Sequence, residues 1–238
     1  MTHVYLLDYQ ITIMPTIYSY LNDNGRAGFV MASSASDAGH SEKTIRKELV
    51  ETGAVDVMVS IANKFFYSVS LPCSLWFFDR AKAKNPEKAD KTLMLDLRNV
   101  FRKVSSALHD FTQEQLESIH AIVNLYRGDN SLFNFLIDKY TKEEKSVELE
   151  WLKSRFPDGE YTDVKGLCKV VSQSEIAEND YSLTPGRYVG IVDQIDEDFD
   201  YKSAMASIME ELNILNADSI ELAKKIQSDY KKLGLWLG

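Results

Sequence analysis

One stretch of the sequence, Val55–Asp79, limits the possible folds more than any other. It contains two apolar runs, Val55–Ile61 and Leu71–Phe78, that are rich in β-branched and aromatic residues and too short to be core helices. We therefore expect two buried strands. Because the segment between them is too short for a right-handed helical crossover, the strands should pair antiparallel, and we expect this hairpin to form an edge of a mixed sheet.

The segment that joins the two strands carries three aromatic rings, Phe65, Phe66 and Tyr67, next to the cation Lys64. Loops held by a rigid sheet often supply ligand contacts, so these rings could face a ligand. They could also close the end of the sheet as ordinary core residues. From the residues alone, the second interpretation is favoured.

Residues 1–100 alternate between helical and extended patterns. A strand is predicted over Arg26–Met31, then a helix that Ser41 caps and that ends at about Thr52, and later a last strand over Lys91–Leu97. Helices and strands that alternate with tight turns are typical of a doubly wound, largely parallel sheet with helices on its faces. The sequence therefore predicts an α/β fold.

From Arg98 onward the strand pattern ends, and residues 101–190 are expected to form a helical and irregular extension. Thr112 can cap a helix that runs to Tyr126, with Gly128 just past its end. Shorter elements are expected farther along: helices over Leu132–Tyr140, Val147–Leu152 and Ser174–Glu178, and an extended piece over Leu167–Val171.

Residues 191–238 begin with an acidic linker and continue as a long helix from about Tyr201 to Leu233. Apolar residues recur along this helix at almost heptad spacing. They include Met205, Ile208, Leu212, Leu215, Leu222 and Ile226. Such a narrow stripe on a terminal helix packs either against a helix of a partner or back onto its own domain, and composition does not decide between the two.

Charge and motif content exclude several functions. The net charge of −9 means that the surface as a whole repels nucleic acid, so a DNA-binding role needs a local basic patch or a basic partner. No uncharged run is long enough to span a membrane. Cys73, Cys168 and the histidines lack metal-ligand spacing, and two scattered cysteines without a signal peptide favour a reducing cytoplasm. Rossmann, Walker and hydrolase motifs are also absent from the sequence.

Several segments resemble, in order, the second half of the catalytic domain of the methyltransferase subunit of type I restriction-modification systems. In the first part of the chain, the matching segments are Gly25–Met31, Ile45–Val50, Val55–Val59 and Phe65–Phe78. Farther along, they are Tyr126–Gly128, Leu167–Lys169 and Leu183–Gly190. The resemblance covers nearly the whole chain, and its most specific parts are the aromatic loop and the last segment.

The resemblance implies a fold and a reaction. The expected fold is the second half of a Rossmann-like methyltransferase sheet, mixed and with an antiparallel edge hairpin, followed by a helical C-terminal region. The expected reaction transfers a methyl group from S-adenosylmethionine to N6 of adenine in duplex DNA. In such enzymes the target base is flipped out of the stack, and the family pattern places Phe66, with Phe65 or Tyr67 beside it, where a ring can stack on that base.

The resemblance also implies partners. Methyltransferase subunits of this family assemble with a specificity subunit, which reads the DNA sequence, and with a restriction subunit. The stripe from Met205 to Ile226 is then expected to contact the specificity subunit. DNA would be reached through the complex, which reconciles the acidic composition of the chain with action on DNA.

The chain departs from the family pattern in one respect. The family carries a glycine-rich cofactor loop and a catalytic Asn-Pro-Pro-Phe/Tyr tetrapeptide upstream of the matching region, and this sequence contains no Pro-Pro. We therefore expect a C-terminal portion of a methyltransferase subunit, inactive alone, with an open apolar edge along Arg26–Met31. The alternative is a non-catalytic protein that binds the specificity subunit through its C-terminal helix.

Overall fold

The computed structural model describes residues 13–66, 70–191 and 201–232. Within 201–232, it describes the side chains of only some residues. The chain divides into two compact units, Met1–Val192 and Asp193–Gly238. The division expected at residue 191 lies next to the boundary between these units. The division expected at residue 100 lies inside the first unit.

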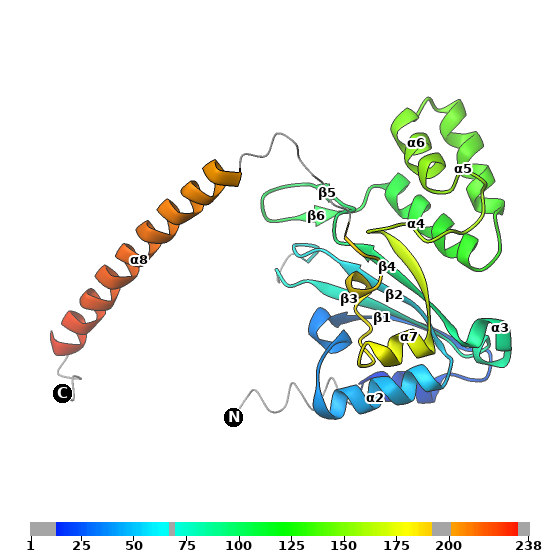
Figure 1. Cartoon of the computed structure of the whole chain (residues 1–238), viewed down its shortest axis with the longest axis horizontal. Helices are drawn as coiled ribbons and strands as arrows, with labels where there is room; N and C mark the ends of the chain where they lie inside the picture. The colour runs from blue at the N-terminus through cyan, green and yellow to red at the C-terminus, as the bar shows by residue number, and fades with distance from the viewer. Residues whose placement is uncertain (1–12, 67–69, 192–200, 233–238) are drawn as a thin grey trace. The chain divides into compact units, whose positions relative to one another are not determined.

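The first unit is built around a five-stranded mixed sheet in the order β1-β3-β2-β4-β7 (Figure 1). Its strands are β1 (Arg26–Ala32), β2 (Val55–Ile61), β3 (Cys73–Asp79), β4 (Lys91–Leu97) and β7 (Cys168–Ser172). β1, β2 and β4 run in one direction, and β3 and β7 run in the other. β2 is buried along its whole length, as expected of a central strand covered on both faces.

The predicted hairpin is present, but it does not form an edge of the sheet. β2 pairs antiparallel with β3, which confirms the pairing that the short connection predicted. The edge position was wrong, because β1 extends the sheet beyond β3 and β4 pairs in parallel with β2 on the other side. Both neighbours bury apolar side chains of the hairpin. The residue pattern of the hairpin does not predict which strands from other parts of the chain pair with it.

The sheet also continues beyond Arg98, contrary to the prediction that the strand pattern ends there. Cys168–Ser172 returns as β7 and pairs antiparallel with β4, from Lys91 opposite Ser172 to Leu95 opposite Cys168. The segment 101–190 therefore supplies a strand as well as helices. A short apolar run such as Leu167–Val171 indicates extended structure but not its pairing partner, and this is why the pairing was missed.

Helices lie on both faces of the sheet (Figure 1). On one face, α2 (His40–Glu51), α7 (Gln173–Glu178) and the helical residues 13–20 enclose a core around Trp76. On the other face, α4 (Gln113–Tyr126) packs over β2 and β4. The unit also contains α3 (Pro86–Ala89), α5 (Ser131–Lys142), α6 (Ser146–Arg155), the short strands β5 (Arg102–Lys103) and β6 (His109–Asp110), and the 3-10 helices η1 (Ser33–Ser36), η2 (Lys82–Lys84) and η3 (Pro185–Arg187).

Two predicted helix caps had different outcomes. The hydroxyl of Thr112 accepts a hydrogen bond from the Gln115 amide at 3.2 Å, and the Gln115 side chain accepts one from the Thr112 amide at 2.9 Å. These bonds form a capping box and confirm the predicted start of α4. The cap at Ser41 was wrong, because α2 begins at His40 after the extended residue Gly39 and no side chain caps it.

The second unit contains the long helix α8 (Tyr201–Lys232), close to the range expected from the sequence. Five residues of the predicted stripe are exposed: Met205, Leu212, Leu215, Leu222 and Ile226. The sixth, Ile208, has its side chain outside the described part of the helix. Among the residues that the structure describes, no helix has the length and hydropathy needed to cross a lipid bilayer.

Candidate functional site

The carboxyl ends of β1, β2 and β4 meet at one edge of the sheet, because these three strands run parallel. In open α/β sheets, ligands bind outside this edge. We call it the strand-end edge. Three segments leave the sheet there: η1 after β1, Ala62–Phe66 after β2 and Arg98–Val100 after β4. A fourth segment, around η3, packs against β2 and β4.

The segment around η3 is bonded to the residues that follow β1. The Leu183 amide donates to the Ser36 carbonyl oxygen at 2.7 Å, and the Thr184 hydroxyl donates to the Ser36 hydroxyl at 3.2 Å. Arg187 forms an ion pair with Asp37 at 2.5 Å, with both side chains partly exposed. These contacts fix the Leu183–Gly190 segment at the strand-end edge.

Gly186 lies against an ion pair at the end of β4. Arg98 donates to the Asp96 carboxylate through Nε at 2.8 Å and through Nη2 at 2.5 Å. These hydrogen bonds raise the pKa of Arg98 above its ordinary value. A Cβ atom at position 186 would collide with the Arg98 guanidinium, so a larger residue there would require the arginine side chain to move.

Arg46 is hydrogen-bonded both to η1 and to the residues just before the Leu183–Gly190 segment. Its side chain comes from α2 and is buried, and it donates to the carbonyl oxygens of Tyr181 at 3.0 Å and Ala35 at 3.3 Å. Burial lowers the pKa of Arg46, and the nearby Asp37 and Glu42 carboxylates act in the opposite direction. Sequence reasoning missed this residue, because an arginine on an amphipathic helix is usually assigned to the solvent-facing side.

The three predicted aromatic residues have different positions. Phe65 packs against Phe111 with ring centroids 4.7 Å apart and lies edge-on to His109, so it is partly buried against the core. Phe66 is 42% exposed at the strand-end edge. Tyr67 lies outside the described residues. The ring of Phe66 is therefore accessible to a ligand, whereas Phe65 supports the loop from below.

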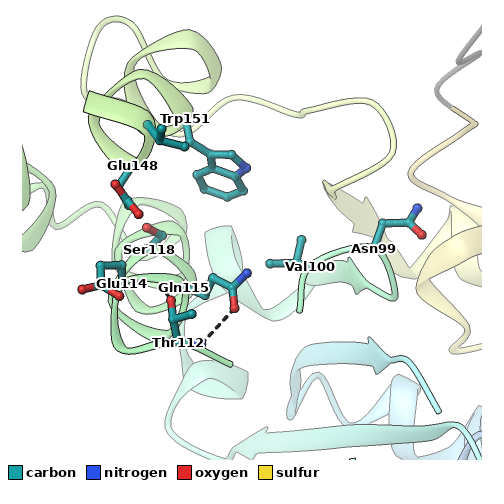
Figure 2. A pocket seen from close by; sticks show the side chains of 9 residues that line it. Asn99, Val100, Thr112, Glu114, Gln115, Ser118, Glu148 and Trp151 are labelled. Carbon is teal, nitrogen blue, oxygen red and sulfur yellow. Dashed lines mark hydrogen bonds between the residues drawn. The ribbon is translucent and has the colours of Figure 1, made fainter. Parts of the chain in front are cut away.

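A pocket of about 220 Å³ lies beside the strand-end edge, next to the residues that follow Arg98 (Figure 2). α4 supplies one wall and α6 the other, and the indole of Trp151 points into the space between them. The pocket combines an aromatic ring with the Gln115 amide and the Glu148 carboxylate. The Arg155 guanidinium covers the indole ring of Trp151, 4.3 Å from its centroid. Sequence reasoning did not identify this pocket, because its walls come from three separate segments.

The described residues do not fit a methyl-donor site by themselves. A glycine-rich turn between a strand and a helix holds such nucleotide cofactors, and β1 is followed instead by Ser33–Ser36, which contains no glycine. Among the described residues, no group of three His, Cys, Asp or Glu side chains could hold a metal ion. Cys73 is buried, and burial raises the pKa of its thiol to about 11, which makes it a poor nucleophile.

Curated relatives of the chain are methylase subunits. The chain is 33% identical over 211 residues to the type I restriction enzyme MjaIX methylase subunit of Methanocaldococcus jannaschii, covering 89% of this chain and 32% of that relative. It is 27% identical over 216 residues to the HindI methylase subunit of Haemophilus influenzae, covering 90% of this chain and 41% of the relative. The chain thus spans about a third to two fifths of the length of these relatives.

A solved structure supports the fold. The M protein of the type I restriction enzyme EcoKI aligns with 90% of this chain and 44% of its own, with a TM-score of 0.52 and 18% sequence identity. The family model described as N-6 DNA Methylase matches residues 8–197, which is most of the chain. On the strength of this match, the chain belongs to the N-6 DNA methylase family.

Proposed function

We propose that this chain is the C-terminal portion of the catalytic domain of a type I restriction-modification methylase subunit. Its reaction is S-adenosylmethionine-dependent methylation of adenine N6 in DNA, and the sheet is the second half of a Rossmann-like methyltransferase sheet. The observation that carries this proposal is the exposed ring of Phe66 at the strand-end edge, in a chain of the N-6 DNA methylase family.

In this proposal Phe66 stacks on the flipped adenine. Stacking of a base on an aromatic side chain contributes on the order of 1–3 kcal/mol. Phe65 holds the loop in place through its contact with Phe111. S-adenosylmethionine would supply the methyl group, and neither its binding nor the activation of the adenine amino group is assigned to residues of this chain.

The remainder of the methylase would dock along β1. This strand is an edge of the sheet in the described structure, because it pairs with β3 on one side only. On the face that α4 covers elsewhere, Val30 of β1 is 52% exposed and Phe77 of the neighbouring strand β3 is 37% exposed. An edge strand beside an uncovered apolar face is suited to accept a further strand with its helix.

Partners are proposed on the same basis. The exposed stripe of α8 is suited to helical contact with a specificity subunit, in a cytoplasmic complex that also holds a restriction subunit. The same stripe supports a second candidate function, in which the chain binds the specificity subunit without taking part in catalysis. The two functions differ in whether the chain is needed for methyl transfer.

The test is a reconstitution with three components: this chain, a specificity subunit and a methylase fragment that carries the Asn-Pro-Pro-Phe/Tyr motif. Transfer of labelled methyl groups to adenine-containing DNA is measured for the full mixture and with each component omitted. We expect methylation only in the full mixture. Replacing Phe66 with Ala should lower kcat/KM by a factor of about 5 to 150, which corresponds to the stacking energy of about 1–3 kcal/mol. Phe135→Ala, which alters another exposed ring, should have no effect.

If the chain binds the specificity subunit but adds no methylation to the mixture, the non-catalytic function is correct. If Phe66→Ala and Phe135→Ala give equal rates, the role of Phe66 is wrong even where the mixture is active.

A further inference from the structure

A small hairpin, formed by β5 and β6, stands at the strand-end edge. The two strands pair antiparallel, with Arg102 opposite Asp110 and Lys103 opposite His109. The amides of Val104 and Ser105 both donate to the Leu108 carbonyl oxygen at 3.0 Å and close the turn. At the base of the hairpin, the ring of Phe101 stacks on His109 at 4.2 Å between centroids and 15° between planes. These contacts give the hairpin a fixed conformation.

The hairpin is bonded to the aromatic loop. The His109 amide donates to the Lys64 carbonyl oxygen at 2.8 Å, and His109 Nδ1 donates to the Asn63 carbonyl oxygen at 3.2 Å. In return, the Lys64 ammonium donates to the Ser106 carbonyl oxygen at 2.7 Å. The hairpin lies on the same side of the sheet as the carboxyl end of β2 (Figure 1). The residues just before Phe66 are therefore held against the hairpin.

The hairpin has a net positive charge in an acidic protein. Residues 101–110 include Arg102, Lys103 and one acidic residue, Asp110, whereas the whole chain has a net charge of −9. Arg102 and Lys103 are both exposed. Asp110 accepts hydrogen bonds from Arg102 at 2.8 and 2.5 Å and so orients its guanidinium. Among the described residues, none forms an ion pair with Lys103.

We propose that the β5–β6 hairpin binds the DNA backbone, with Arg102 and Lys103 contacting phosphodiester groups beside the base at Phe66. Exposed guanidinium and ammonium groups bind phosphate oxygens, and such contacts set the register of a protein on a duplex without reading its sequence. The tip residues Ser105, Ser106 and Ala107 are small, so they leave the two cations free to approach the duplex. This inference rests on the proposed function and names the residues that position its substrate.

The test measures binding of a short fluorescein-labelled duplex to the full chain by anisotropy over a series of salt concentrations. The variant Arg102→Gln/Lys103→Gln is compared with Lys47→Gln/Lys153→Gln, which removes two exposed cations elsewhere and has the same net charge. Each phosphate contact contributes about −0.9 to the slope of log K against log salt concentration. We expect the hairpin variant to lose roughly 1.8 from that slope and about tenfold in affinity at low salt, and the control to match the wild type.

Two outcomes would overturn the hairpin contact: equal slopes for the hairpin variant and the control, or no binding by the wild type at low salt. Thermal unfolding of both variants checks that they are folded. The reconstituted methylation assay separates this inference from the proposed function. If the wild-type mixture methylates DNA and the hairpin variant has an unchanged KM for DNA, the hairpin contact is wrong and the proposed function stands. If no mixture methylates DNA but the hairpin variant still loses binding, the hairpin contact stands and the proposed function is wrong.

Discussion

Adjacent residues of the aromatic loop have opposite environments. Phe65 is held by Phe111 and His109, which come from a segment far along the chain, while Phe66 is exposed. The sequence places both rings on the connection between two buried strands. It does not tell which ring is covered, because the covering residues lie far along the chain, His109 in the β5–β6 hairpin and Phe111 just after it. At this scale, sequence narrows a candidate to a short segment and tertiary packing selects the residue.

Lys82 is a buried cation at the edge of the sheet opposite the candidate site. It is 6% exposed, and its ammonium donates to the Val55 carbonyl oxygen. Burial lowers the pKa of Lys82 to about 8, although Asp56 and Asp79 attract the charge and act in the opposite direction. In the unfolded chain a lysine has a pKa of about 10.4. Between these two values the unfolded state binds more protons, so this group makes the protein more stable as pH rises.

This linkage predicts the behaviour of Lys82→Met. The quantity to compare is the difference in free energy of unfolding, wild type minus variant. From about pH 8 to about pH 9.5, this difference should rise by about 1 kcal/mol per pH unit. Urea unfolding at a series of pH values measures the difference. Lys84→Met, which replaces an exposed lysine two residues away, is the matched control, and the prediction requires a steeper rise for Lys82→Met than for this variant. A flat or falling difference for Lys82→Met would contradict the buried, partly deprotonated lysine.

At the scale of elements, local pattern predicts what local interactions determine. The strands β1, β2 and β4 were predicted to within a residue, because each is a short apolar run between turn residues. The start of α4 was predicted for the same reason, since its capping box lies within four consecutive residues. Apart from the β2–β3 pairing, the neighbours of the strands were not predicted. β7 pairs with β4 although α4, α5 and α6 lie between the two strands in the sequence. The residue pattern within either strand does not predict this pairing.

The capping box of α4 has a measurable effect on stability. Thr112→Ala removes the acceptor for the Gln115 amide and should lower the free energy of unfolding by about 1 kcal/mol. Urea unfolding measures this loss. Thr141→Ala in α5 is the control, because its hydroxyl bonds within the helix to the Ile137 carbonyl oxygen and alanine has the higher helix propensity. We expect no loss there, and equal losses at the two positions would contradict a specific role for the cap.

At the scale of the whole molecule, the first unit has a strand-end edge that carries the candidate site and an edge strand, β1, that pairs on one side only in the described structure. The strand-end edge gathers Phe66, the Arg98–Asp96 pair, η3 and the cationic hairpin. The edge strand β1, with its exposed residue Val30, and Phe77 of β3 have no cover on the face that α4 covers elsewhere in the described structure. The sequence predicted the open edge only through resemblance to a family, since a strand's own residues do not show which side is unpaired. The central claim is that β1 accepts the rest of a methylase.

Amide hydrogen exchange of β1 tests this claim most directly. The full chain is measured alone and with a methylase fragment that carries the Asn-Pro-Pro-Phe/Tyr motif. We expect the β1 amides that do not pair with β3 to exchange more slowly in the mixture, because they gain partners in a new strand. The amides of β7, at the opposite edge, should be unchanged. A stable complex in which β1 exchanges as fast as in the chain alone would contradict completion of the sheet at β1.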